Sequence, residues 1–143
     1  MRTTLSRRLT ATPLRWLALL ALSAAYLQSA LEKALDFGGA SAEYAQLGLL
    51  PATPLVLATI VLELGAVLAV LGNRGRCLGA LLLAGFTLAA TFVALRYWTL
   101  PLPQRAIVAH NFYENLGLCG GWLLVAWQDL RERADRALLQ THR

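Results

Sequence analysis

Long apolar runs separated by short polar segments occupy most of the chain. Four of these runs are long enough to cross about 30 Å of hydrocarbon as α-helices, at about 1.5 Å per residue. They cover residues 14–35, 52–72, 77–98 and 107–127. The pattern therefore predicts an all-α integral membrane protein, folded as a four-helix bundle whose transmembrane domain covers residues 14–128.

The segments between the runs fit helices that are antiparallel neighbours. Residues 72–76, rich in Gly and Asn, predict a tight turn. Two prolines in residues 100–103 are expected to end the third span, because proline cannot continue a helix. The longer segment 36–51 contains Tyr44 and Leu47, which favours a short helix lying in the membrane interface. A disordered loop is the alternative for this segment.

The composition favours a membrane protein over a soluble one. Hydrophobic residues make up 57% of the 143 residues and charged residues 15%, whereas a soluble domain carries about 25% charged residues. The formal net charge is +5 and comes from arginines gathered near both ends. Basic residues beside membrane spans orient those spans. The positive charge therefore indicates topology, and no nucleic-acid partner is expected.

Basic residues are distributed unevenly between the two sides of the predicted bundle. Three of the 13 Lys and Arg residues, Lys33, Arg96 and Arg105, fall on the side opposite the termini. The other ten fall on the side of the termini: Arg2, Arg7, Arg8, Arg15, Arg74, Arg76, Arg131, Arg133, Arg136 and Arg143. Because positive loops stay inside, both termini are expected in the cytoplasm of a bacterium, with the spans in its inner membrane.

The chain ends carry no predicted chemistry. Residues 1–13 form a basic cytoplasmic segment, and residues 129–143 form a charged cytoplasmic tail with opposite charges four residues apart, which pair along a helix. The arginines ahead of the first apolar run also fit a cleaved secretory signal or a twin-arginine signal, and this alternative stays open.

Common cofactor motifs are missing. Cys77 and Cys119 make neither a CxxC pair nor a disulfide framework. His110 and His142 are the only histidines, so two histidines at membrane depth cannot reach one haem. There is no glycine-rich nucleotide loop. No covalently bound cofactor is expected, and His110 with Glu114 would give a metal too few ligands.

Each predicted span carries one stripe of small or polar residues at helical spacing, about 100° per residue. Such stripes usually face protein rather than lipid, because polar groups at membrane depth are penalised. We therefore expect all four to face the interior. The stripes are Ala21, Ala25, Gln28 and Glu32; Thr59, Glu63, Ala66 and Val70; Ala80, Ala84, Thr87 and Thr91; and His110, Glu114, Gly117 and Gly121, flanked by Asn111 and Asn115.

The depths of the polar residues predict one pocket that opens on the side opposite the termini. Its expected lining is Gln28, Glu32, Lys33, Glu63, His110, Asn111 and Glu114. Less specific explanations exist for the main members. Glu63 could be a carboxyl group hydrogen-bonded between helices, and Lys33 could be an anchor that reaches for the headgroups. His110 and Glu114 could be an interfacial pair that only orients the helix.

Several short motifs, in this order, resemble the DoxX family of small four-span bacterial membrane proteins. The resemblance covers about residues 14–127. It rests on Lys33, Leu47-Gly48-Leu49-Leu50-Pro51, Glu63-Leu64-Gly65, Gly72-Asn73-Arg74, Ala84-Gly85-Phe86 and the stretch 111–121, NFYENLGLCGG. It implies an inner-membrane four-helix bundle. Relatives act as quinone-linked thiosulfate dehydrogenase subunits, and others associate with soluble redox enzymes in membrane complexes.

The leading hypothesis is a redox-associated membrane subunit whose pocket holds a quinone or a similar small amphipathic ligand. Glu63, His110 and Glu114 would exchange its protons. Gln28, Glu32, Lys33, Asn111, Trp98 and Trp122 would surround it. Catalysis by this chain alone is not expected, so its partners would be the bilayer, other membrane or peripheral redox subunits, and a second copy. The alternative hypothesis is a non-catalytic accessory or assembly subunit. A transporter ranks third, since broken helices and inverted repeats are missing.

Overall fold

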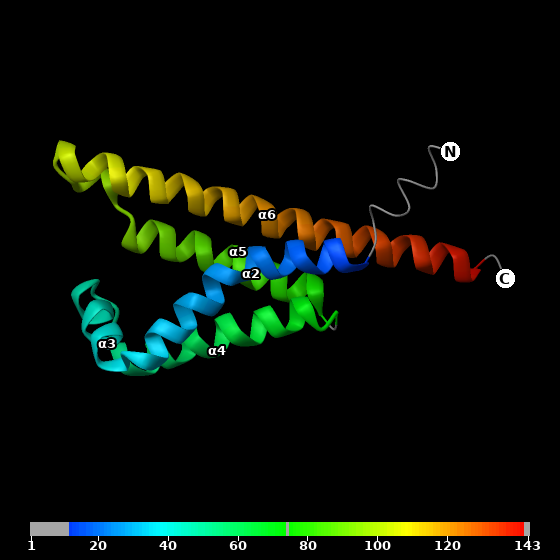
Figure 1. Ribbon diagram of the computed structural model, residues 1–143, viewed down its shortest axis with the longest axis horizontal. Coiled ribbons are helices and arrows are strands. Elements are labelled where there is room, and N and C mark those ends of the chain that lie inside the picture. The colour runs from blue at the N-terminus through cyan, green and yellow to red at the C-terminus, as the bar shows by residue number, and fades with distance from the viewer. Residues whose placement is uncertain (1–11, 74, 142–143) are drawn as a thin grey trace.

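The computed structural model describes residues 12–73 and 75–141, and every regular element in this part of the chain is helical (Figure 1). The all-α prediction is confirmed. The elements are α2 (Thr12–Leu35), α3 (Phe37–Gln46), α4 (Ala52–Leu71), α5 (Arg76–Ala94), the 3₁₀ helix η1 (Tyr97–Thr99) and α6 (Leu102–Thr141). The proposed N-terminal signal and the basic residues Arg2, Arg7, Arg8, Arg74 and Arg143 lie outside the described residues.

Three segments of the described chain are long and apolar enough to cross a membrane. They are Pro13–Leu35, Ala52–Leu71 and Arg76–Thr99, with mean hydropathies of 1.3, 2.4 and 2.2. The fourth predicted span lies inside α6, which is 40 residues long. Its first half carries the polar residues of the stretch 110–115, and its last part is charged.

The connections between helices have clear local causes. Asp36 caps α3, because its Oδ1 accepts a hydrogen bond from the Gly39 N–H at 2.9 Å. The short helix predicted in the segment 36–51 is therefore present. Asn73 and Gly75 have positive φ angles of 59° and 86° in the turn between α4 and α5, a conformation that Asn and Gly tolerate best. The regular α-helix α5 ends at Ala94, but the apolar span continues through η1 to Thr99, so the third span ends just before the prolines, as expected.

The inward faces of α4 and α5 were predicted correctly. All eight residues of their two stripes are buried: Thr59, Glu63, Ala66, Val70, Ala80, Ala84, Thr87 and Thr91. The two helices approach closely at Gly79, where an added Cβ would lie 2.6 Å from the carbonyl oxygen of Ala66. Small residues at this contact let the two backbones pack against each other.

The predicted inward faces of α2 and α6 were wrong. Ala21, Ala25, Gln28 and Glu32 are exposed, and so are His110, Glu114 and Gly117. The buried face of α2 is made by Leu19, Ser23, Tyr26 and Ala30, and that of α6 by Phe112, Cys119, Trp122, Ala126 and Asp129. The core takes the large aromatic residues because their polar atoms find partners there: Trp122 Nε1 donates to the Tyr26 hydroxyl at 3.0 Å, and that hydroxyl also bonds to Thr87 Oγ1.

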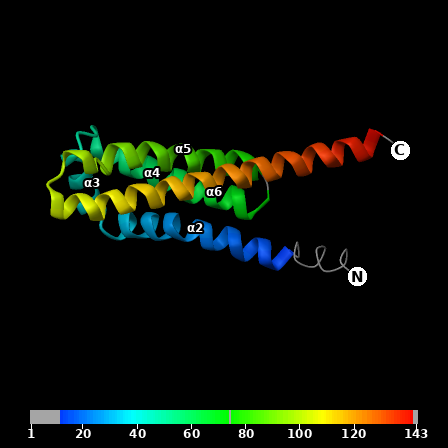
Figure 2. The ribbon, with the colours of Figure 1, turned by 90° about the horizontal axis from the view of Figure 1, so that it is seen from above.

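The helices form a fork rather than a closed bundle. In Figure 1 they converge toward the end that carries the two termini, here called the terminal end, and diverge toward the opposite end, here called the α3 end. At the α3 end one arm holds α3, α4 and the last turns of α2, and the other holds α5, η1 and the start of α6. Figure 2 shows α5 and α6 running side by side, with α6 extending beyond the other described helices at the terminal end.

Polar contacts between helices close the terminal end. Arg15 of α2 pairs with Glu132 of α6 at 2.6 Å. The carboxylate of Asp129, on α6, is only 3% exposed and accepts hydrogen bonds from the Cys77 backbone N–H at 3.3 Å and from Arg133 Nε at 2.9 Å. Asp129 thereby satisfies a free N–H at the start of α5, where a helix end favours negative charge.

Candidate ligand cavity

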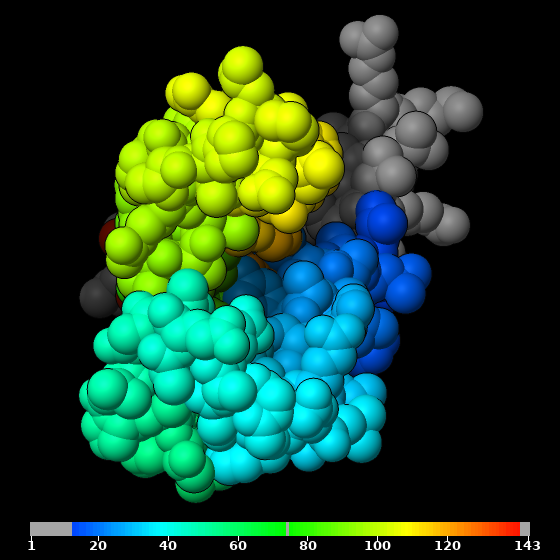
Figure 3. All heavy atoms as spheres, turned by 90° about the vertical axis from the view of Figure 1, so that its left-hand side faces the viewer, coloured from blue at the N-terminus to red at the C-terminus, as the bar shows by residue number. Residues whose placement is uncertain are grey.

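A cavity of about 430 Å³ lies in the fork, and each of the five α-helices in the described part of the chain contributes to its wall. Figure 3, a view onto the α3 end, shows the hollow between the two arms. Its sides differ in chemistry, because α2, α3 and α4 supply polar groups and α5 supplies an apolar surface.

The polar side centres on an ion pair between α2 and α4. Lys33 Nζ lies 3.4 Å from both carboxylate oxygens of Glu63. Ser29, one turn before Lys33 on α2, donates its hydroxyl to Glu63 Oε1 at 3.0 Å and is also bonded to Lys33 Nζ. Glu63 is 1% exposed. A carboxylate this deep needs charged and hydrogen-bonding partners, and the α2 residues supply them.

Two hydroxyl contacts extend the polar side. Tyr44 of α3 donates to Thr59 Oγ1, one turn from Glu63 on α4, at 3.0 Å. The Tyr26 and Thr87 pair lines the cavity farther from the α3 end, with Trp122 behind it. Hydroxyl groups therefore stand on both sides of the ion pair along the cavity.

The apolar side is formed mainly by α5. Besides Thr87, five apolar residues of α5 line the cavity: Phe86, Ala89, Ala90, Val93 and Ala94. Three of these residues are alanines, whose short side chains leave room for a flat group beside α5. Leu118 and Asn115 complete the lining from α6. A flat molecule placed here would rest one face on α5 and turn a polar edge toward Lys33 and Glu63.

A second hollow of about 530 Å³, here called the vestibule, lies between the last turns of α2 and the helix α3. Its lining includes the carboxylates of Glu32, Asp36 and Glu43. Four lining residues belong to both hollows: Ser29, Lys33, Glu43 and Tyr44. These shared residues separate an acidic compartment from the largely apolar cavity.

Comparison with known sequences identifies the family. A family model named DoxX matches residues 15–96, more than half of the chain. The chain belongs to the DoxX family. The matched part runs from α2 to the connection after α5 and includes Lys33 and Glu63. Neither a curated protein nor a solved structure matched the chain.

The structure divides the residues expected to line one pocket of this DoxX protein. Lys33 and Glu63 come together in the cavity, and Glu32 lines the vestibule. Gln28 is exposed and donates to Glu32 Oε1 at 2.9 Å. Asn111, which precedes the lining residue Asn115 by one turn, is exposed. The expectation of one common pocket was therefore wrong, because α2 and α6 turn other faces inward.

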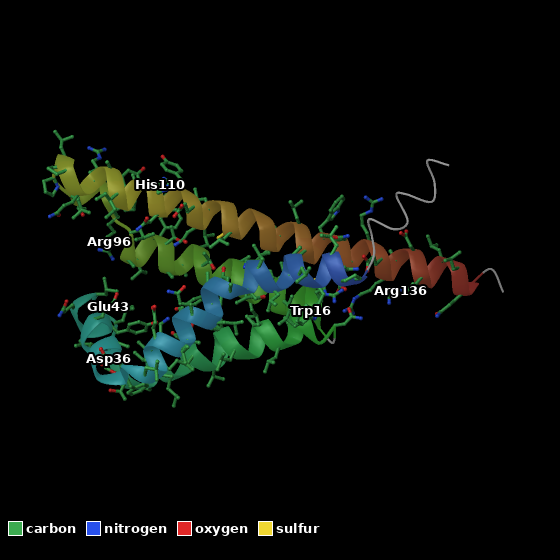
Figure 4. The ribbon with its side chains drawn as sticks, viewed as in Figure 1. Trp16, Asp36, Glu43, Arg96, His110 and Arg136 are labelled. Atoms are coloured by element: carbon green, nitrogen blue, oxygen red, sulfur yellow. The ribbon has the colours of Figure 1, made fainter. Side chains whose placement is uncertain are left out.

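The four remaining candidates lie away from the ion pair. His110 Nε2 is 3.0 Å from Glu114 Oε1, but these side chains are 73% and 61% exposed on the outer side of α6. Figure 4 places His110 on the α5–α6 arm, across the fork from Asp36 and Glu43. Trp98 is exposed in an aromatic cluster with Tyr97 and Phe112.

Trp122 reaches the cavity only through Tyr26. The roles of these residues in binding or catalysis stay predictions.

Sequence reasoning missed Ser29 and Tyr44. Ser29 precedes Lys33 by four residues, a spacing that places both side chains on one helix face, so this signal was available. Tyr44 could not be placed, because the direction of α3 depends on tertiary packing. Among the described residues, no group of three or more His, Cys, Asp or Glu side chains could hold a metal ion, and Cys77 and Cys119 are both free.

Proposed function

We propose that this DoxX family protein binds the head group of a quinone in the cavity and serves as a membrane subunit of a redox complex. The observation that carries this proposal is a buried ion pair, Lys33 with Glu63, facing an otherwise largely apolar cavity. Buried ion pairs contribute little to stability, because desolvation offsets their attraction. Ionisable groups at membrane depth usually bind ligands or move protons.

The cavity suits a quinone ring in size and in chemistry. Ligand pockets commonly measure about 300–1,000 Å³, lined mostly by apolar groups with a few polar ones. The alanine-rich wall of α5 would support the ring. The Lys33 ammonium would donate a hydrogen bond to a quinone oxygen, and the Glu63 carboxylate would accept a proton from a hydroquinone hydroxyl.

The electrons would come from or go to a partner subunit. Reduction of a quinone to a hydroquinone consumes electrons and protons in equal number. Lys33 and Glu63 provide groups that hold protons, whereas the chain has no motif for an electron carrier. The proposal therefore assigns proton handling to this chain and electron transfer to a membrane or peripheral redox protein.

The proposal includes four membrane crossings, with α6 as the fourth. Aromatic residues occur near both ends of the helices: Tyr97 and Trp98 at the α3 end, Trp16 and Trp127 at the terminal end. Arg131 lies over the Trp127 ring at 4.9 Å. Such belts mark the two membrane surfaces. The excess of arginine at the terminal end supports cytoplasmic termini in a bacterial inner membrane.

Quinone binding is the direct test. The protein would be purified in native lipid discs, its lipids extracted, and ubiquinone and menaquinone titrated into the depleted sample. We expect wild-type protein to retain a quinone and Glu63→Gln to bind it about tenfold more weakly, the loss of roughly one charged contact. Asp135→Asn, a carboxylate change on the exposed part of α6, serves as the matched control. The proposal is rejected if wild-type protein binds no quinone, or if Glu63→Gln binds it as tightly as wild type.

A second candidate function is an accessory subunit without its own ligand. It is favoured by the outer side of α6, which exposes His110, Glu114 and Gly117. An added Cβ at Gly117 would meet no atom within 4 Å, so packing within the chain does not explain this glycine. Co-purification distinguishes the two functions. A partner in fixed stoichiometry that is lost on Gly117→Leu, with an empty cavity, supports the accessory role.

A further inference from the structure

The cavity has a side opening between α2 and α6. Near the terminal end the two helices are in contact: Arg15 pairs with Glu132, and an added Cβ at Gly121 would lie 3.3 Å from Leu22. Toward the α3 end they part, as Figure 1 shows. In this parted region Ala25 of α2 and Leu118 of α6 both line the cavity. The gap bordered by Ala25 and Leu118 is here called the slit.

The α2 edge of the slit is accessible from outside the chain, as an opening at this place requires. Ala25 lines the cavity and is nevertheless exposed. On α6, Leu118 is half-buried, and its neighbour Gly117 is exposed. The slit also lies at membrane depth, because Ala25 stands ten residues before the end of α2 at Leu35, about 15 Å along the helix. An opening at this height meets acyl chains.

The slit and the vestibule differ in the chemistry of their edges. Ala25 and Leu118 border the slit, whereas Glu32, Asp36 and Glu43 border the vestibule. Moving apolar groups from hydrocarbon into a carboxylate-lined aqueous space is unfavourable, and the penalty grows with every CH₂ group moved. A long isoprenoid tail would therefore stay in the slit and the bilayer.

We propose that the ligand reaches the cavity sideways from the bilayer through the slit and leaves its apolar tail lying between α2 and α6. This inference rests on the proposed quinone function. It adds that the natural ligand carries a long tail and is exchanged with the membrane. The vestibule connects the Lys33 and Glu63 pair with water and admits only small polar species.

Site-directed labelling distinguishes the two routes. Single cysteines would be placed at Ala25 in the slit, at Ala40 in the vestibule and at Ala21, an exposed alanine one turn from Ala25 on α2. The background is Cys77→Ser with Cys119→Ser. Each protein would be reconstituted in lipid discs and compared before and after reaction with a bulky fluorescent maleimide, so that every sample is its own control for folding.

The readout is the association rate of two ubiquinones, one with a full isoprenoid tail and one without a tail. Labelling Ala25→Cys is expected to lower the association rate of the tailed quinone about tenfold, because the label blocks its path. The association rate of the tail-less quinone should stay unchanged. Labelling Ala40→Cys should slow only the tail-less quinone. Labelling Ala21→Cys should affect neither. The inference is overturned if the label at Ala40 slows the tailed quinone and the label at Ala25 does not.

A second measurement does not depend on quinone binding. A fluorophore on Ala25→Cys should be quenched by brominated lipids and not by aqueous iodide, and one on Ala40→Cys should show the reverse. Iodide quenching at Ala25 would mean that the slit faces water and would overturn the inference. If these quenching results hold but neither quinone binds, the proposed function fails while the opening to the bilayer stands.

Discussion

The two ends of the molecule use polar groups in opposite ways. At the terminal end, Asp129 and Arg15 join helices to one another, and their partners complete the contacts. At the α3 end, Lys33 and Glu63 also join two helices, but they face a cavity. The same four long helices are thus closed at the terminal end, here called the base, and open as a fork at the α3 end. Polar groups at the base only join helices to one another, whereas those in the fork join helices and also line a cavity.

The largest effect on stability is expected from the base. Asp129→Ala removes the acceptor for the Cys77 N–H and for Arg133, and bonds to a charged group contribute about 1.5–3 kcal/mol each. We expect the free energy of unfolding in detergent to fall by about 3 kcal/mol. Asp135→Ala on the same helix should change it little. Equal stability of these two variants would show that the base is not held by Asp129.

A slightly smaller effect is expected at the contact between α4 and α5. Gly79→Ala would bring a Cβ to 2.6 Å from the Ala66 carbonyl oxygen, and overpacking of this kind costs about 1–3 kcal/mol. Gly85→Ala, on the same helix, meets nothing within 4 Å and should be neutral or stabilising by up to about 1 kcal/mol. Thermal unfolding of the two variants checks the difference. Similar melting temperatures would contradict the close approach.

Removal of the ion pair in the fork should alter stability much less. In the double variant Lys33→Met with Glu63→Leu, apolar groups replace both charges, a change that is often neutral or stabilising in buried pairs. We expect unfolding to shift by no more than about 1 kcal/mol, while quinone binding is lost. A strong loss of stability in this variant would remove the contrast between fork and base, and would assign the pair a structural role.

The smallest effect is expected for the pair on the outer side of α6. Exposed ion pairs contribute little, so His110→Gln should leave the unfolding of the isolated chain unchanged. The same variant is informative for assembly. If the accessory function holds, it weakens co-purification of a partner; if the cavity alone carries function, neither stability nor association changes. Size-exclusion chromatography with light scattering distinguishes the isolated chain from the chain bound to a partner.

Prediction from the sequence succeeded where a helix offered one candidate stripe. In α4, Glu63 and Thr59 stand among Leu and Val, so only one face could avoid lipid. In α2 and α6, two stripes competed. The rule that small and polar residues face inward selected Gln28 and His110, but the core took Tyr26 and Trp122, which satisfy each other's polar atoms.

The candidate site was predictable only in part, for the same reason. The depths of Lys33 and Glu63 suggested that they could meet, and they do. Their partner Tyr44 and the separation of His110 from the cavity depend on how far α2 and α6 diverge. No local pattern encodes that divergence, because it depends on contacts between residues far apart in the chain, such as Arg15 and Glu132, which are 117 positions apart.

The amino-acid sequence by itself determined the helices, the apolar segments, the turn at Asn73 and Gly75, and the inward faces of α4 and α5. These features follow from hydropathy, backbone preference and helical spacing, which act over a few residues. Only the tertiary structure decided which faces of α2 and α6 point inward, that the bundle opens as a fork, and that Glu63 meets Lys33 and Ser29 beside a cavity. Those outcomes depend on which buried polar atoms can satisfy one another across helices, and that is decided only when the helices pack.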